Sequence, residues 1–248
     1  MVKQKANKLL AVQFVKRLHA LRSAAELKKF HRYFTFDENE TGDGDRFIGV
    51  RMGHVFGLAK EFIEMPPDEI EKLLESPIHE VRAGGCSIMG KQADYKKTPE
   101  YRRKELYDLY LRRHDRINDW DLVDLASYKV VGSYLFDFDK PRKVLYKLSG
   151  SKNPWERRTA ILSTAYFIRK GEVEDTFALA ELLTNDDHEL VNKATGWMLR
   201  YAGDKDRQRL LRFLDKYAAT IPRILLRNAI EKLDKKHREY YLGRKKAE

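Results

Sequence analysis

The chain has 248 residues and a formal net charge of +11, from 49 lysines and arginines against 38 aspartates and glutamates. Its single cysteine, Cys86, excludes an internal disulfide and a thiolate metal site, and no apolar run approaches the roughly 20 residues that cross a bilayer. The positive charge favours an anionic partner, most simply nucleic acid, although the same lysines and arginines could merely solvate the outer faces of many helices.

Two distinctive segments lie before residue 50. Residues 1–21 are amphipathic and basic without an apolar signal core, which favours a first capping helix over a transit peptide or a surface-binding helix. Residues 37–49, DENETGDGDRFIG, predict a polar, glycine-bearing loop. The GDGD string at residues 42–45 superficially resembles a calcium loop, but the glutamate expected at the end of such a loop is missing.

Helical periodicity dominates the rest of the chain, and strand signals are scarce. Apolar residues recur at helical spacing at Val173, Phe177, Ala180 and Leu183, at Leu210, Leu214 and Tyr217, and at Leu226, Ile230 and Leu233. The prolines that favour helix starts are Pro77, Pro154 and Pro222. We therefore expect one all-α domain over residues 1–248, with a basic C-terminal tail from about residue 236.

A helix-opening phrase recurs along the chain with a charged or polar residue in the same slot each time. The aligned residues, at steps of 42, 34, 35 and 35 residues, are Arg82, Asp124, Arg158, Lys193 and Asn228. A period of this size indicates a helical solenoid, in which stacked helix pairs share one continuous core. Stacking would bring the aligned positions side by side on one concave wall, and we call these five residues the aligned row.

Asp124 is the first candidate for chemistry, since it lies among apolar neighbours in the second turn of an expected helix. A carboxylate at such a position is costly to bury unless something pairs with it. One interpretation is a structural salt bridge to Arg158 or Lys193. The other is a carboxylate kept ionised by surrounding cations, which could stabilise a developing positive charge or orient a water for attack.

Two tryptophans share helical faces with members of the aligned row. Trp120 is four residues before Asp124, and Trp197 is four residues after Lys193. Tryptophans on helices are usually core residues. If these two instead flank the carboxylate, their indoles favour a cationic ligand through the ring quadrupole. Trp155 is expected to pack at a helix start.

Arg158 and Lys193 are expected near helix N-termini. Free backbone N–H groups and the helix dipole favour anions there, and a phosphate is the natural ligand. The alternative is pairing with Asp124 or Glu156, and the two interpretations can both hold.

The sequence contains no motif for a metal or a cofactor. Its seven histidines show neither metal-type spacing nor a pattern of cysteine partners. It lacks a Walker-type phosphate loop, a Rossmann glycine fingerprint and a nucleophile elbow, so a serine-histidine-aspartate hydrolase has no support. We therefore expect no cofactor and no metal ion.

Four segments of the sequence together resemble the AlkD-like DNA alkylation repair glycosylases, which are enzymes of HEAT-like helical repeats. The segments are 44–51 (GDRFIGVR), 118–124 (NDWDLVD), 153–162 (NPWERRTAIL) and 193–200 (KATGWMLR), and the resemblance extends over about residues 30–235. It implies an all-α, right-handed superhelical solenoid of HEAT-like helical repeats with a concave basic face. It also implies excision of positively charged alkylpurines such as 3-methyladenine and 7-methylguanine.

The resemblance also implies roles for single residues. By motif, Asp124 corresponds to the family's catalytic aspartate and Arg158 to its active-site arginine. Trp120 and Trp197 correspond to the aromatic pair beside the lesion. The residues expected to contact DNA phosphates are Lys193, Arg82 and Arg157.

Two positions depart from the family pattern. Asp119 stands where members often carry a second tryptophan before Trp120. Residues 52–57, MGHVFG, stand where many members continue with proline and a basic residue. Both departures concern contacts at the N-terminal rim of the expected superhelix. The residues matched to the family's active site are unchanged.

Three functional interpretations follow. The first is a monofunctional DNA glycosylase that hydrolyses the N-glycosidic bond of cationic alkylpurines in double-stranded DNA. It would be a monomer without a membrane partner, located in the bacterial cytoplasm and nucleoid-associated when bound to DNA. The others are a non-catalytic HEAT-like module that binds nucleic acid, and a scaffold for an acidic protein. The combination of Trp, Asp and Arg favours the first, since a phosphate-binding wall gains nothing from a central carboxylate.

Overall fold

The computed structural model describes residues 9–30 and 45–244 of the chain. In this described part, all regular elements are helical except an isolated bridge between Arg46 and Ile78, so the prediction of an all-α fold is confirmed. None of the described helices has the length and hydropathy of a membrane span. Residues 37–44, which hold most of the predicted polar loop and of the calcium-like string, lie outside the described residues.

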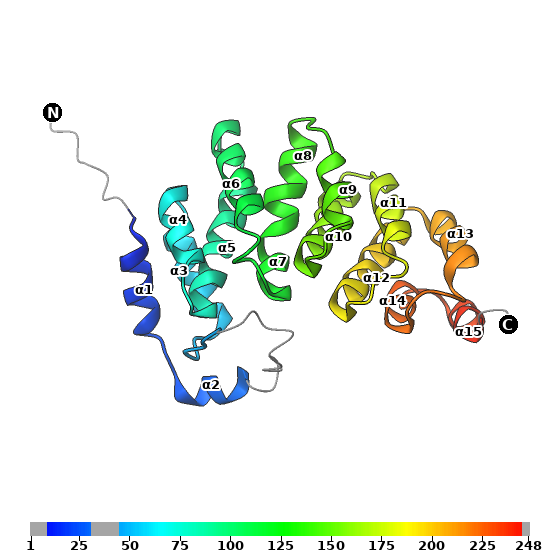
Figure 1. Cartoon of the computed structure of the whole chain (residues 1–248), viewed down its shortest axis with the longest axis horizontal. Coiled ribbons are helices and arrows are strands. Elements are labelled where there is room, and N and C mark those ends of the chain that lie inside the picture. Colours follow the sequence, from blue (N-terminus) through cyan, green and yellow to red (C-terminus); the bar gives the residue numbers. More distant parts are fainter. Residues whose placement is uncertain (1–8, 31–44, 245–248) are drawn as a thin grey trace. The chain divides into compact units, whose positions relative to one another are not determined.

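The chain forms two compact units, one ending at Ala126 and the other beginning at Ser127. The helices of the first unit are α1 (Ala11–His19), α2 (Ala24–Phe30), α3 (Met52–Glu61), α4 (Pro67–Leu74), α5 (His79–Asp94), α6 (Glu100–Arg112) and α7 (Trp120–Ser127), whose last residue belongs to the second unit (Figure 1). The second unit contains the π-helical segment η1 (Tyr128–Gly132) and the helices α8 (Ser133–Asp137), α9 (Lys143–Ser149), α10 (Pro154–Arg169), α11 (Glu174–Leu182), α12 (Glu189–Gly203), α13 (Arg207–Tyr217), α14 (Arg223–Ala229) and α15 (Lys235–Gly243).

The first unit is built around α5, which packs against α3, α4 and α6. Helix α1 lies against α3 and α4, and the Ala11 backbone N–H donates to Glu69 Oε2 at 2.8 Å. A helix therefore stands where the amphipathic N-terminal segment predicts one, although residues 1–8 lie outside the described residues. Phe14 and Leu18 from α1 are fully buried. Cys86 is buried in α5, and burial raises the pKa of its thiol.

The second unit displays the predicted repeat directly. Helix α12 packs against α10 on one side and α14 on the other, while α9 lies against α10 and α11 against α12. Arg158 and Lys193 are each the fifth residue of their helices, and Asn228 is the sixth residue of α14. The helices approach closely, since a Cβ at Gly196 of α12 would overlap the carbonyl oxygen of Leu225 on α14. The helical repeat is thus confirmed in this unit.

Local sequence sets the start of α10 as expected. Pro154 is its first residue, and the Asn153 side chain accepts a hydrogen bond from the Trp155 N–H at 2.9 Å. Such a cap satisfies one of the N–H groups that a helix start leaves without an intrahelical partner. Trp155 is buried and contacts the edge of the His188 ring, with the ring centroids 5.5 Å apart. Its predicted packing role is confirmed.

Most of the segment predicted as a basic C-terminal tail forms α15. The Asp234 carboxylate caps this helix by accepting from the His237 N–H at 3.1 Å. Tyr241 is buried, and its hydroxyl donates to Asp215 at 2.9 Å. One cap and one buried aromatic side chain therefore stabilise this basic helix. Residues 245–248 lie outside the described part.

Candidate active site

Helix α7 carries Trp120 and Asp124 one turn apart, so both side chains share a face of the helix. Both residues are half-buried. The helix begins directly after Asp119, whose Oδ1 accepts the Trp120 N–H at 2.6 Å. At its other end α7 is followed immediately by the π-helical segment η1. Short π segments inside helices are frequent at functional sites, and this one begins at Tyr128, four residues after Asp124.

Backbone N–H groups of the segment before α3 donate to a carboxylate at the start of α5 and fix the segment there. The buried Glu80 carboxylate accepts the N–H groups of Ile48 at 3.0 Å, Gly49 at 2.8 Å and Val50 at 3.2 Å. Gly49 has a φ of +76°, and a Cβ there would overlap the carbonyl oxygen of Ser23. Glycine is therefore required at this turn. These contacts place Asp45 beside the first turn of α5.

A buried cluster of charged side chains surrounds His79, the first residue of α5. Its Nδ1 lies 3.1 Å from Asp45 Oδ2, and its Nε2 lies 2.8 Å from Asp121 Oδ2 on α7. The Phe47 ring stacks on the imidazole with the centroids 4.7 Å apart. The imidazole thus links the segment before α3 to the first turn of the helix that carries Trp120 and Asp124.

The charges of this cluster are strongly coupled. Burial alone would lower the pKa of His79, but Asp121 and Asp45 outweigh it and raise the pKa to about 10. Burial would raise the pKa of Asp45, yet hydrogen bonds from His79 and Arg82 hold it below its usual value. Burial raises the pKa of Asp119 to about 7, and the nearby Asp121 adds to this shift. At neutral pH the His79 ring is therefore cationic and donates from both nitrogens.

Arg82 belongs to this cluster and not to an exposed phosphate-binding surface. Its side chain is fully buried, and its guanidinium forms an ion pair with Asp45. It also donates to the Ser76 carbonyl at 3.3 Å and to Asn118 Oδ1 at 3.4 Å. The Arg82 guanidinium has no exposed surface in this structure, and the phosphate contact expected of it stays a prediction.

In the second unit, Lys193 and Trp197 lie one turn apart on α12, where Lys193 is half-buried and Trp197 is exposed. Trp197 is 43% exposed, which is unusual for so large an apolar side chain. Lys193 Nζ pairs with Glu189 on the same helix at 2.5 Å, and its side chain is 44% exposed. Arg158 on the neighbouring α10 is buried, and one of its guanidinium N–H groups donates to the Leu190 carbonyl at the start of α12.

Arg157 uses its whole guanidinium within the second unit. Its Nε and Nη2 donate to the two oxygens of Asp186 at 2.6 and 2.9 Å, and Nη2 also reaches Asp187 at 3.2 Å. Its Nη1 donates to the carbonyls of Ser151 and Lys152 at 3.0 and 3.1 Å. These five contacts match the five N–H donors of the group. Arg157 therefore ties together the turns that precede α10 and α12, and its expected phosphate contact stays a prediction.

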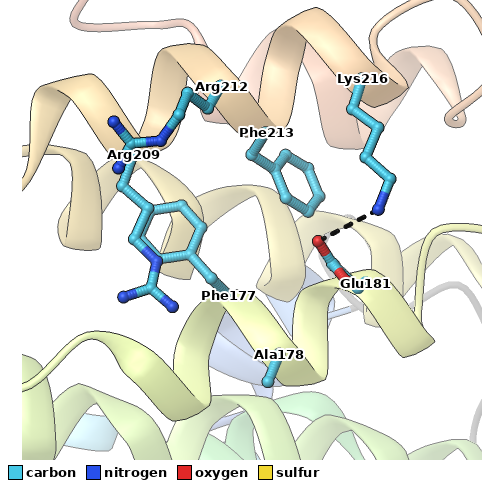
Figure 2. Close-up of a pocket in the computed structure, with 7 residues that line it drawn as sticks. All are labelled: Phe177, Ala178, Glu181, Arg209, Arg212, Phe213 and Lys216. Carbon is cyan, nitrogen blue, oxygen red and sulfur yellow. Dashed lines mark ion pairs between the residues drawn. The ribbon is translucent and has the colours of Figure 1, made fainter.

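The described cavities lie away from the aligned row. One groove of about 320 Å³ lies between α11 and α13, where the Arg209 guanidinium stands 5.1 Å from the centre of the Phe177 ring (Figure 2). Lys216 faces Glu181 across this groove at 3.7 Å. A second hollow, of about 540 Å³, is lined by Lys60, Tyr95 and Tyr101 among others. Neither is lined by a member of the row.

The cluster around His79 includes residues that the sequence did not predict as site residues. Asp45 belongs to the GDRFIGVR segment, and Asp119 and Asp121 flank Trp120. The acidic run at positions 119, 121 and 124 was the available signal, since three carboxylates within two helical turns need partners. The convergence of Trp120 and Asp124 with Arg158, Lys193 and Trp197 stays a prediction of the repeat alignment.

A family model described as DNA alkylation repair enzyme matches residues 14–233 of the chain. The chain belongs to this family. It is also similar to a solved structure, a predicted DNA alkylation repair enzyme from Enterococcus faecalis, with 16% identity and a TM-score of 0.68. The match covers 86% of this chain and 97% of the other, and at such identity it shows the fold alone. A comparison with curated proteins gave no match.

Membership in the DNA alkylation repair enzyme family confirms the resemblance found in the sequence. The four segments that carry the resemblance lie within the matched range. The match therefore includes Trp120 and Asp124 in the first unit and Arg158, Lys193 and Trp197 in the second.

Proposed function

We propose that this DNA alkylation repair enzyme is a monofunctional glycosylase, which hydrolyses the N-glycosidic bond of positively charged alkylpurines in duplex DNA. The substrates would be bases such as 3-methyladenine and 7-methylguanine. The observation that carries the proposal is the pairing of a half-buried carboxylate, Asp124, with a half-buried indole, Trp120, on one face of α7. Such a pair suits a cationic ligand, because both groups attract positive charge.

The chemistry needs little beyond a well-placed carboxylate. A purine alkylated at N3 or N7 carries a positive charge and leaves as a neutral base, so no general acid has to protonate it. As the glycosidic bond breaks, positive charge develops on the deoxyribose. An ionised Asp124 would stabilise that charge and guide the attacking water. Water then supplies the hydroxyl of the sugar product, and its proton is released.

The two tryptophans would supply selectivity by charge. Indole faces attract a cationic nucleotide through the ring quadrupole and gain much less from a neutral one. The 43% exposure of Trp197 leaves its ring accessible to such a ligand. We assign Trp120 and Trp197 to the alkylated nucleotide on this ground and on that of the family resemblance.

The cations of the second unit would hold the DNA. The side chain of Lys193 is 44% exposed near the start of α12, where the helix dipole also favours a phosphate. We assign Lys193 to a phosphate contact that gives affinity without sequence readout. Arg158 is assigned to the active site, as the family resemblance implies. Because Lys193 is assigned to a phosphate, no lysine of the aligned row is assigned to Schiff-base attack.

The test is base release from methylated duplex DNA. The wild-type protein should liberate free 3-methyladenine and 7-methylguanine, separated and quantified by chromatography. Asp124→Asn should abolish release while DNA binding, followed by fluorescence anisotropy, is retained. The matched control is Asp187→Asn, an isosteric change at a 95% exposed side chain, which should leave release unchanged. Equal release by Asp124→Asn and wild type would remove the catalytic assignment. If the wild-type protein bound DNA and released no base, the result would favour a non-catalytic module.

A further inference from the structure

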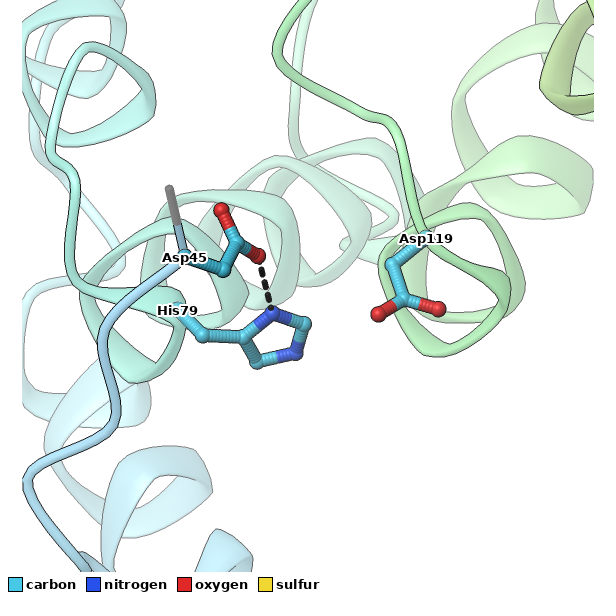
Figure 3. Close-up of side chains that lie close together, drawn as sticks. All are labelled: Asp45, His79 and Asp119. Atoms are coloured by element: carbon cyan, nitrogen blue, oxygen red, sulfur yellow. Dashed lines mark hydrogen bonds and ion pairs between the residues drawn. The ribbon is translucent and has the colours of Figure 1, made fainter. Parts of the chain in front are cut away.

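Three donor side chains converge in the interior of the first unit from positions far apart in the sequence. Asp45 comes from the segment before α3, His79 opens α5, and Asp119 precedes α7 (Figure 3). One ligand atom from each lies within 4.8 Å of the other two. Figure 3 shows a carboxylate oxygen of Asp119 directed toward the imidazole, with Asp45 on its other side.

Asp119 supplies the observation that points to a missing ligand. Its side chain is 1% exposed, and its Oδ1 accepts the Trp120 N–H. Its Oδ2 is buried without a hydrogen-bond partner. A buried carboxylate oxygen left without a donor is costly, so such oxygens in folded proteins are normally bonded or coordinated. This carboxylate is the one that Figure 3 shows directed toward the imidazole of His79.

His79 has the hydrogen-bonding arrangement that metal-ligating histidines commonly show. Its Nε2 donates to Asp121, and a carboxylate on this outer nitrogen fixes the ring orientation, while Nδ1 donates to Asp45 and would give up its proton to bind a cation. Nδ1 lies 3.1 Å from Asp45 Oδ2. Two ligand atoms of a tetrahedral zinc site, with bonds of about 2.0–2.2 Å, stand about 3.3–3.6 Å apart. The existing separation is therefore close to that of two ligands on one ion.

The charge balance of the cluster also suits a divalent cation. Three carboxylates, those of Asp45, Asp119 and Asp121, face the guanidinium of Arg82 around one imidazole. Arg82 bonds to Asp45 and would remain as its outer partner, holding that carboxylate in place. Once the ion has replaced the proton on His79, its two positive charges and that of the guanidinium would balance the three carboxylates.

We propose that Asp45, His79 and Asp119 bind one divalent transition-metal ion, for which Zn²⁺ is the probe, with Asp121 and Arg82 as outer partners. A nitrogen donor together with carboxylate oxygens favours Zn²⁺ or a similar ion over Mg²⁺ and Ca²⁺, which prefer oxygen ligands alone. The ion takes the place of the proton on Nδ1 and draws the ligand atoms inward by about 1 Å. It ties the segment before α3 to α5 and to the start of α7. This site stands independently of the proposed glycosylase activity.

The first experiment measures metal binding by the full-length, tag-free protein after treatment with a chelator. Equilibrium dialysis against Zn²⁺, with metal content read by mass spectrometry, should give one equivalent that Asp119→Asn lacks. Asp119→Asn keeps the size of the side chain and the bond to the Trp120 N–H, so it should fold, as a thermal melt without metal would verify. Its affinity should fall at least about 10-fold, the lower end of what even outer-partner changes cause. The control Asp187→Asn should bind like the wild type.

A second readout covers the case in which a variant is unstable. Co²⁺ bound to the wild-type protein should give visible absorption bands that Zn²⁺ removes by competition. Zn²⁺ should also raise the melting temperature of the wild type and of Asp187→Asn, and not that of Asp119→Asn. Absence of a bound equivalent and of Co²⁺ bands in the wild type would overturn the proposal. Equal binding by wild type and Asp119→Asn would overturn it too, since the ion would then lie elsewhere, for example at the exposed His237 and Asp234 pair.

Discussion

Replacing Asp119 by asparagine should stabilise the metal-free protein at neutral and alkaline pH. Wild-type Asp119 is buried, with one carboxylate oxygen unpartnered, and its pKa is raised to about 7. Above that pH the folded protein must hold a negative charge in a dry site next to Asp121. Asparagine has almost the same shape and cannot ionise. The variant therefore escapes the free-energy cost that wild type meets when the carboxyl group loses its proton.

The sign and size of the effect follow from linkage. The folded pKa of about 7 lies above the ordinary value of 3.8, so folding favours the protonated form. The stability of the wild type is full below about pH 4 and falls as the pH rises from 4 to 7. The two proteins should therefore have similar free energies of unfolding near pH 4. Above pH 7 the variant should be more stable by up to roughly 4 kcal/mol, from about three pKa units at about 1.4 kcal/mol each.

The assay is urea denaturation followed by tryptophan fluorescence, at pH values between 4 and 9 and in the presence of a chelator. The difference in the free energy of unfolding between variant and wild type should grow between pH 4 and 7 and then level off. Asp187→Asn, at a 95% exposed position, should show no such growth. An Asp119→Asn protein that is less stable than wild type at pH 8 would refute the reasoning, because Asp119 would then stabilise the fold as an anion.

Two further substitutions separate DNA contact from structure in the second unit. Lys193→Ala should weaken DNA binding and reduce the slope of log K against log salt by about 1, measured by anisotropy at several salt concentrations; an unchanged slope would remove its phosphate contact. Arg157→Ala should lower the free energy of unfolding by about 3 kcal/mol in urea denaturation, because it leaves the buried Asp186 carboxylate without its guanidinium. Arg157→Lys should recover only part of this loss, since lysine lacks the forked geometry. If Arg157→Ala reduced the salt slope and left the free energy of unfolding unchanged, the result would instead support a phosphate contact by Arg157.

The helical repeat could be predicted because it depends on the spacing of residues along the sequence. The 35-residue steps between Arg158, Lys193 and Asn228 reflect successive helices that pack on one another, as α10, α12 and α14 do. Proline and asparagine at the start of α10 act through the adjacent backbone, so they too were readable. Periodicity of this kind needs no knowledge of distant contacts.

The exposure of the aligned residues was not predictable from the same spacing. Arg82 and Lys193 occupy aligned positions, but one is fully buried and the other 44% exposed at its side chain. The difference arises because the segment carrying Asp45 covers the first turn of α5, whereas α12 has no such cover over Lys193 among the described residues. A repeat alignment predicts the position of a residue on its helix. It does not predict whether a non-repeating segment covers that residue. For the same reason the alignment did not predict the cluster around His79, whose members come from positions 45, 79 and 119.

The position of that cluster has a consequence for α7. Asp121 is bonded to His79, and it follows Trp120 by one residue and precedes Asp124 by three. Successive residues of an α-helix are rotated by about 100°, so Asp121 points about 100° away from Trp120 and about 60° away from Asp124. The cluster therefore holds α7 from beside the face that carries the indole and the carboxylate. Fixing one side chain of the first turn sets the rotation of the helix about its axis. An anchor of this kind can orient a candidate catalytic carboxylate and still leave its ligand-facing surface open.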